Sequence, residues 1–140
     1  MVQLVVGKKG KGKTKIVLDM VNKEIVSAKG NIVYLDKNLD HMYELNNKIR
    51  LINACDYGIN NPDEFVGFIR GIISQDHDLE QMFFDSFLKI SGLNGFERFS
   101  EVVTKLEEIS NEYGFKIVMS ISADESELPD ELKSKVIVSL

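Results

Sequence analysis

A glycine- and lysine-rich segment near the N-terminus, GKKGKGKT at residues 7–14, constrains the fold more than any other feature of this sequence. It follows a short apolar run, VQLVV, and precedes a segment in which apolar residues recur at helical spacing as far as Ile25. The first pattern predicts a buried strand, and the second predicts an amphipathic helix that stops at Gly30. A strand, a tight glycine loop and a helix in direct succession are typical of an α/β fold.

The spacing within this segment also predicts chemistry. Gly7, four further residues and then Gly12-Lys13-Thr14 satisfy the pattern G-x-x-x-x-G-K-[ST]. Glycines let the backbone turn so that successive N–H groups point inward, and the N-terminus of the following helix attracts the same anion. Lys13 is expected to reach the β- and γ-phosphates of a nucleotide, and the Thr14 hydroxyl to take one Mg²⁺ position. The predicted phosphate-binding residues are Gly7, Lys8, Lys9, Gly10, Lys11, Gly12, Lys13, Thr14 and Lys15.

The charge of the chain is concentrated in the same loop. Residues 1–15 contain five lysines and no acidic residue, which leaves 12 of the 17 basic residues and all 22 acidic residues to the rest of the chain. A basic surface loop would show the same lysines, but it would not require the flanking strand and helix. The acidic remainder disfavours nucleic acid as a partner.

The other patterns complete a single domain over residues 1–140. We predict a three-layer α/β sandwich, with a mostly parallel sheet of five to six strands and helices on both faces. No apolar run approaches the roughly 20 residues that span a bilayer, and the one cysteine, Cys55, is expected to be a small core residue at a strand end. These features favour a cytoplasmic protein. The further strands are predicted at 32–36, 51–55, 82–85, 115–120 and 136–138, and two further helices start at Asn61-Pro62 and near Phe96.

Two aspartates end predicted strands, where parallel sheets bind their ligands. Asp85 follows the apolar run Met82-Phe83-Phe84, and we predict that it holds Mg²⁺ together with Thr14. Asp36 is its rival for that role. An aspartate that caps a loop with Ser86 would give the same pattern at Asp85.

These segments together resemble the RecA-like branch of the P-loop NTPases, which includes RecA, DnaB and KaiC. GKKGKGKT resembles the Walker A motif, and Phe83-Phe84-Asp85-Ser86 resembles Walker B. The resemblance covers essentially the whole chain. It implies an extra strand between the Walker A and Walker B strands, binding of ATP with Mg²⁺, and catalytic roles for Lys13 and Asp85. It also implies a polar sensor of the γ-phosphate near Ser120, although a serine turning out of a strand would fit as well.

The same resemblance implies a catalytic glutamate just beyond the second strand, and this chain has none there. Asn38 is near the expected position, and an amide is not a general base at neutral pH. Asp36, Asp40 and Glu44 are the candidates for the base, and the sequence does not choose among them. Two functions stay open: a RecA-like ATPase with slow hydrolysis, and a nucleotide-dependent switch or binding module without turnover.

A dimeric ATPase similar to MinD and ParA is a third interpretation, because Lys8 lies where those proteins carry a lysine that reaches the partner's nucleotide. Lys9 replaces the glycine that follows that lysine in their motif.

ATP is favoured over GTP, since the segment 120–124 lacks the lysine with which GTPases recognise guanine. A protein partner or a homo-oligomer is expected, with a basic residue from a second subunit accelerating hydrolysis.

Overall fold

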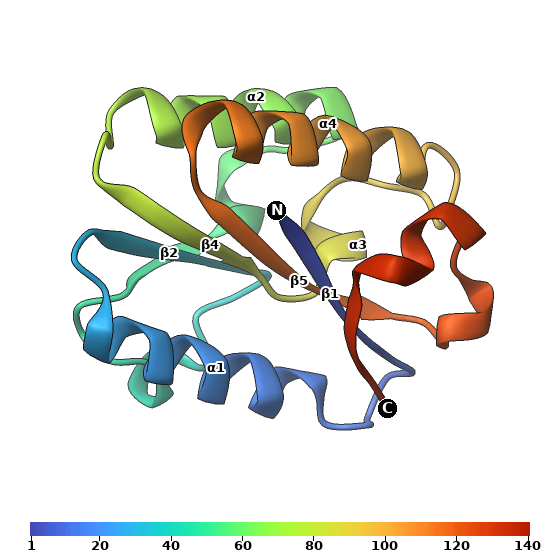
Figure 1. The fold of residues 1–140 in the computed structure, drawn as a ribbon, viewed down its shortest axis with the longest axis horizontal. Coiled ribbons are helices and arrows are strands. Elements are labelled where there is room, and N and C mark those ends of the chain that lie inside the picture. The colour runs from blue at the N-terminus through green and yellow to red at the C-terminus, as the bar shows by residue number, and fades with distance from the viewer.

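The computed structural model describes all residues, 1–140, and contains one sheet of six parallel strands. The sheet lies between two helical layers, with α1 on one face and α2, α3 and α4 on the other (Figure 1). This is the three-layer α/β sandwich predicted from the sequence. The strands are β1 (Val2–Gly7), β2 (Asn31–Asp36), β3 (Arg50–Asn53), β4 (Leu79–Phe84), β5 (Lys116–Ser122) and β6 (Val136–Ser139). The helices are α1 (Lys13–Ser27), α2 (Pro62–Ser74), α3 (Phe87–Ile90) and α4 (Phe99–Tyr113), with short 3₁₀ turns η1 (Met42–Glu44), η2 (Ala54–Tyr57), η3 (Glu125–Glu127) and η4 (Asp130–Lys135).

The strand order across the sheet is β3-β2-β4-β5-β1-β6. β5 therefore lies between β1, which precedes the glycine loop, and β4, which precedes Asp85. This confirms the extra strand that the RecA-like resemblance implied. Because every pairing is parallel, all six strands direct their carboxyl ends to one edge of the sheet.

Both faces of the sheet are buried, which is why its strands are almost continuously apolar. On one face, Val17 and Val21 of α1 pack with Val5, Phe83 and other strand residues. The opposite face supports a larger core beneath α2 and α4. There Phe65, Phe84, Phe87 and Phe99 form an aromatic cluster with centroid separations between 5.4 and 6.1 Å. Each ring is fully buried and contributes about 1.5–3 kcal/mol to folding.

Two local expectations were wrong. α1 ends at Ser27 and not at Gly30. Gly30 instead lies against the Asp78 carbonyl oxygen. A Cβ at residue 30 would be 2.0 Å from that oxygen, so only glycine permits this close approach. Cys55 is exposed and not in the core. The Asn53 side chain accepts a hydrogen bond from the Cys55 N–H at 3.1 Å, which ends β3 and turns the chain outward.

Candidate functional site

The glycine loop connects β1 to α1 at the carboxyl edge of the sheet. Gly10 and Gly12 have φ angles of 86° and 94°, in the left-handed region that favours glycine. Gly7 has a different reason to be glycine, because a Cβ there would lie 2.9 Å from Leu140 Cβ. α1 starts without a side-chain cap and without an acidic residue in its first turn. Its first N–H groups are therefore free to bind an anion.

Lys13 is folded back across this loop. Its side chain is 7% exposed, and its Nζ donates to the Lys8 carbonyl oxygen at 3.3 Å. Burial lowers the pKa of Lys13, the nearby Asp85 carboxylate opposes this shift, and the Lys37 ammonium group adds to it. The ammonium group is held in place by a backbone oxygen, with no carboxylate paired to it.

Asp85 follows β4 directly and is 3% exposed. Its Oδ1 accepts hydrogen bonds from the Ser120 hydroxyl at 2.6 Å and from the Ser86 N–H at 3.0 Å. Its Oδ2 accepts one from the Tyr34 hydroxyl at 3.2 Å. Ser86 adopts a left-handed φ of 58°, and its N–H also donates to Ser120 Oγ. Groups from β2 and β5, the two neighbours of β4, thus fix the carboxylate from both sides.

The loop and Asp85 face a common cavity of about 330 Å³. None of the residues around it is hydrophobic, so the cavity suits a hydrated or charged group. Its walls are formed by Lys9, Gly10, Gly12, Lys13, Thr14, Lys37, Asp85, Ser86, Ser120 and Ser122. The structure therefore brings together most of the residues predicted as a site, and their role in binding stays a prediction.

The remaining predicted residues lie elsewhere. Gly7, Lys8, Lys11 and Lys15 do not line the cavity. Lys8 contributes only its carbonyl oxygen to Lys13, and Lys15 pairs with Asp19 on α1 at 3.5 Å.

Lys37 lines the cavity but was not predicted as a site residue from the sequence, where the segment after the second strand was of interest only for a catalytic glutamate. Its position directly after a predicted strand end was the signal that could have identified it.

The three candidates for a catalytic base are all outside the cavity. Asp36 is 1% exposed; its Oδ1 accepts from the Lys37 N–H at 2.7 Å, and its Oδ2 has no partner. Burial, with a smaller contribution from Asp85, raises the pKa of Asp36 to about 6. Asp40 and Glu44 are exposed, and Glu44 pairs with His41 at 2.6 Å. Asp85 is thus the only carboxylate that lines the cavity.

The donor set at the cavity fits Mg²⁺. Thr14 and Asp85 supply one hydroxyl and one carboxylate, and no cluster of three or more histidine, cysteine or acidic residues occurs in the protein. Mg²⁺ binds oxygen ligands and usually keeps several waters, with one or two carboxylates and substrate phosphates completing its shell. When bound, it would neutralise charge between neighbouring phosphates.

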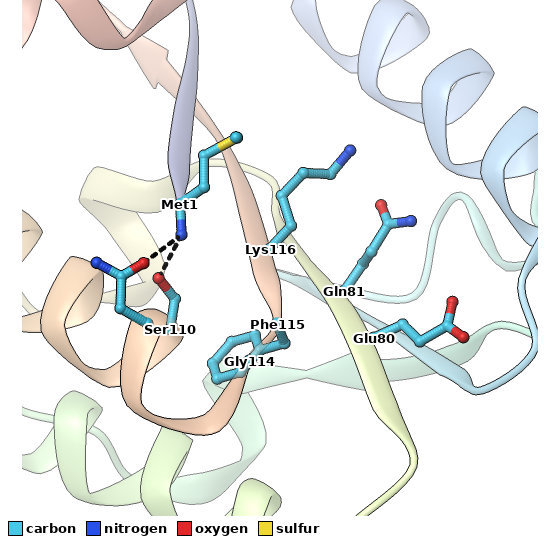
Figure 2. A pocket seen from close by; sticks show the side chains of 8 residues that line it. Met1, Glu80, Gln81, Ser110, Gly114, Phe115 and Lys116 are labelled. Carbon is cyan, nitrogen blue, oxygen red and sulfur yellow. Dashed lines mark hydrogen bonds between the residues drawn. The ribbon is translucent and has the colours of Figure 1, made fainter.

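A second cavity, of about 500 Å³, lies at the opposite edge of the sheet (Figure 2). Its walls include Gln81, the third residue of β4, and Lys116 at the start of β5. Both side chains hydrogen-bond to the Glu24 carboxylate, at 3.3 and 3.5 Å. The Gln81 amide nitrogen and the Lys116 ammonium group are therefore both engaged by a carboxylate of α1, while the Gln81 Oε1 has no partner.

Comparison with known proteins places the fold. No protein-family profile matches the chain, and no curated protein matches its sequence. By contrast, 101 chains of solved structures match, so the fold itself is widespread. One is a KaiC-like protein from the hyperthermophilic archaeon Pyrococcus horikoshii OT3, with a TM-score of 0.61 and 20% identity. The match covers 87% of this chain and 62% of that protein.

The chain therefore shares the fold of this KaiC-like protein, and a likeness at this identity shows the fold alone. No helix in the structure has the length and apolar character needed to cross a bilayer.

Proposed function

We propose that this protein binds ATP with Mg²⁺ in the cavity formed by the glycine loop and Asp85. The main observation in support is that Lys13, Thr14 and Asp85 line one cavity without hydrophobic walls, at the carboxyl edge of a parallel sheet. Ligands of open α/β sheets bind at this edge. In this proposal the free N–H groups of the loop and of α1 bind the phosphates, Lys13 contacts the β- and γ-phosphates, and Thr14 and Asp85 hold the ion.

Hydrolysis is proposed to be slow or absent. Activation of the attacking water needs a base within hydrogen-bond reach, directly or through one water. Asp85 is the only carboxylate at the cavity, and it already accepts three hydrogen bonds. This observation favours a nucleotide-dependent switch, or an ATPase that depends on a residue from a partner or second copy.

Calorimetric titration with ATP and with GTP, each with Mg²⁺, tests the binding. Wild type should bind ATP more tightly than GTP, and Lys13→Ala should lose at least about 30-fold in ATP affinity, since it removes a largely buried charge from its partners. Lys48→Ala is the matched control, because Lys48 is an exposed lysine on the approach to β3, at the other edge of the sheet.

Phosphate release from the same samples separates the two functions. Release that disappears in Lys13→Ala would identify an ATPase. Tight binding with negligible release would identify a switch. No binding of either nucleotide by wild type would overturn the proposal.

A further inference from the structure

Lys37 lines the proposed phosphate cavity from the side opposite the glycine loop. It directly follows Asp36, the last residue of β2, and its N–H donates to the Asp36 carboxylate at 2.7 Å. β2 lies beyond β4 in the sheet, whereas β1 and the glycine loop lie on the other side of β4 (Figure 1). The cavity therefore receives lysine side chains from two separate directions.

The ammonium group of Lys37 has no carboxylate partner. Nine of the fourteen lysines form no ion pair, and among these nine only Lys13 and Lys37 are not exposed. Its charge instead acts on Lys13, whose pKa it lowers. The two ammonium groups face one cavity and repel each other. An anion placed between them would attract both, and this attraction would outweigh their repulsion.

Strand register indicates which part of a nucleotide Lys37 would meet. The last paired residues of β2 and β4 are Leu35 and Phe84, so Lys37 and Ser86 each follow two residues later. The same register puts Asp36 level with Asp85, so Lys37 lies one residue beyond the proposed metal ligand and lines the same cavity. Thr14 and Asp85 would hold Mg²⁺, which would neutralise charge on the terminal phosphates, whereas the backbone of the glycine loop would bind the phosphates nearer the nucleoside.

We infer that Lys37 binds the terminal phosphate and gives the site its preference for nucleoside triphosphate over diphosphate. The inference rests on the proposed function and adds a specificity-determining residue to it. Asp85 is the only carboxylate at the cavity, and Lys37 adds a cation there, which would stabilise a bound triphosphate without providing a base.

Titration of ATP and ADP, each with Mg²⁺, into Lys37→Gln tests this inference. Loss of a charge-assisted hydrogen bond should weaken ATP roughly 10- to 150-fold, while ADP should change less than about threefold. Lys37→Arg keeps the charge and should retain most of the preference for ATP. Lys48→Gln removes one exposed lysine charge at the other edge of the sheet and should change neither affinity.

The possible outcomes separate this inference from the proposed function. If wild type binds neither nucleotide, the proposed function fails and the inference fails with it. If wild type binds both, and Lys37→Gln weakens ATP and ADP equally or leaves both unchanged, only the role of Lys37 is overturned. Thermal unfolding of each variant checks that affinities are compared between folded proteins.

Discussion

The two edges of the sheet both carry a cavity, and they differ in how their charges are partnered. The amino edge has the larger cavity, about 500 Å³ against 330 Å³. There the Met1 nitrogen donates to Ser110, as Figure 2 shows, and to Asn111, and Lys116 pairs with Glu24. At the carboxyl edge, Lys13 and Lys37 have no carboxylate partner in the protein. Among the nine lysines without an ion pair, the two that are not exposed, Lys13 and Lys37, both line the smaller cavity, so unpaired and shielded charge identifies the candidate site better than cavity size does.

The difference follows from the topology of the sheet. At the amino edge the chain enters β2 and β4, and the Glu80 carboxylate accepts hydrogen bonds from the N–H groups of Lys29 and Gly30 at 3.0 and 2.7 Å. These polar groups satisfy the backbone where strands begin. At the carboxyl edge the chain leaves the strands, and the loops there can vary without loss of the core. We therefore expect substitutions at the amino edge to affect stability, and substitutions at the carboxyl edge to affect binding.

The largest effect is expected from a pair of glycine substitutions. Gly30→Ala would force a Cβ onto the Asp78 carbonyl oxygen and should lower the free energy of unfolding by about 3 kcal/mol or more, with ATP affinity of the folded protein unchanged. Gly12→Ala meets open space but needs a left-handed backbone. It should cost only about 1–2 kcal/mol in stability and strongly weaken ATP binding. Urea unfolding measures the stability of each variant, and calorimetry measures its affinity for ATP. A Gly30→Ala protein as stable as wild type would contradict the predicted difference between the two edges.

Asp36 should give the carboxyl edge a pH-dependent stability. Its pKa rises from 3.8 to about 6 on folding, so the folded state holds a proton that the unfolded state releases. This contribution is complete below pH 4 and is lost as the pH rises through 6. The free energy of unfolding of wild type should therefore fall, relative to that of Asp36→Asn, by up to about 3 kcal/mol between pH 4 and pH 7. Denaturation curves at several pH values measure the difference, and parallel curves for the two proteins would contradict it.

Tyr34→Phe should have a smaller effect that depends on Mg²⁺. The substitution keeps the buried ring, which stacks on Phe83, and removes only the hydroxyl that donates to Asp85. Stability should fall by about 1–2 kcal/mol, because one carboxylate oxygen loses its partner. ATP affinity should fall in the presence of Mg²⁺ and stay unchanged in EDTA. An equal loss under both conditions would mean that Tyr34 supports the fold without positioning the metal ligand.

Lys8→Gln should have the smallest effect, and it tests the interpretation as a dimeric ATPase similar to MinD and ParA. The Lys8 side chain is exposed and lies outside the cavity, while its carbonyl oxygen, which the substitution keeps, holds Lys13. In the monomer ATP affinity should change less than about threefold, as expected for a surface charge. Sedimentation with ATP and Mg²⁺ measures assembly; an ATP-dependent dimer of wild type that Lys8→Gln abolishes would favour the dimeric ATPase.

The sequence predicted the fold class and most of the cavity, and the failures have local causes. Alternating strands and helices with apolar strands were enough to give the three layers and the parallel sheet. The exposed position of Cys55 was not predictable from the apolar run before it, because a hydrogen bond to the Asn53 side chain ends that strand early. Gly30 was predicted as a helix stop, but a glycine is required there because the Asp78 carbonyl group, just before β4 and about 50 residues further along the chain, leaves no room for a Cβ.

The sequence by itself determined the glycine loop, because the loop depends only on consecutive residues. These form a strand, glycines that permit a left-handed backbone, a lysine and a helix start. Only the tertiary structure determined which side chains line the cavity opposite the glycine loop. Tyr34 and Asp85 are 51 residues apart, and Lys37 enters the same cavity only because β2 pairs with β4 after a crossover through β3 and α2. Backbone conformation depends on neighbouring residues, whereas the meeting of strand ends depends on how the whole sheet packs.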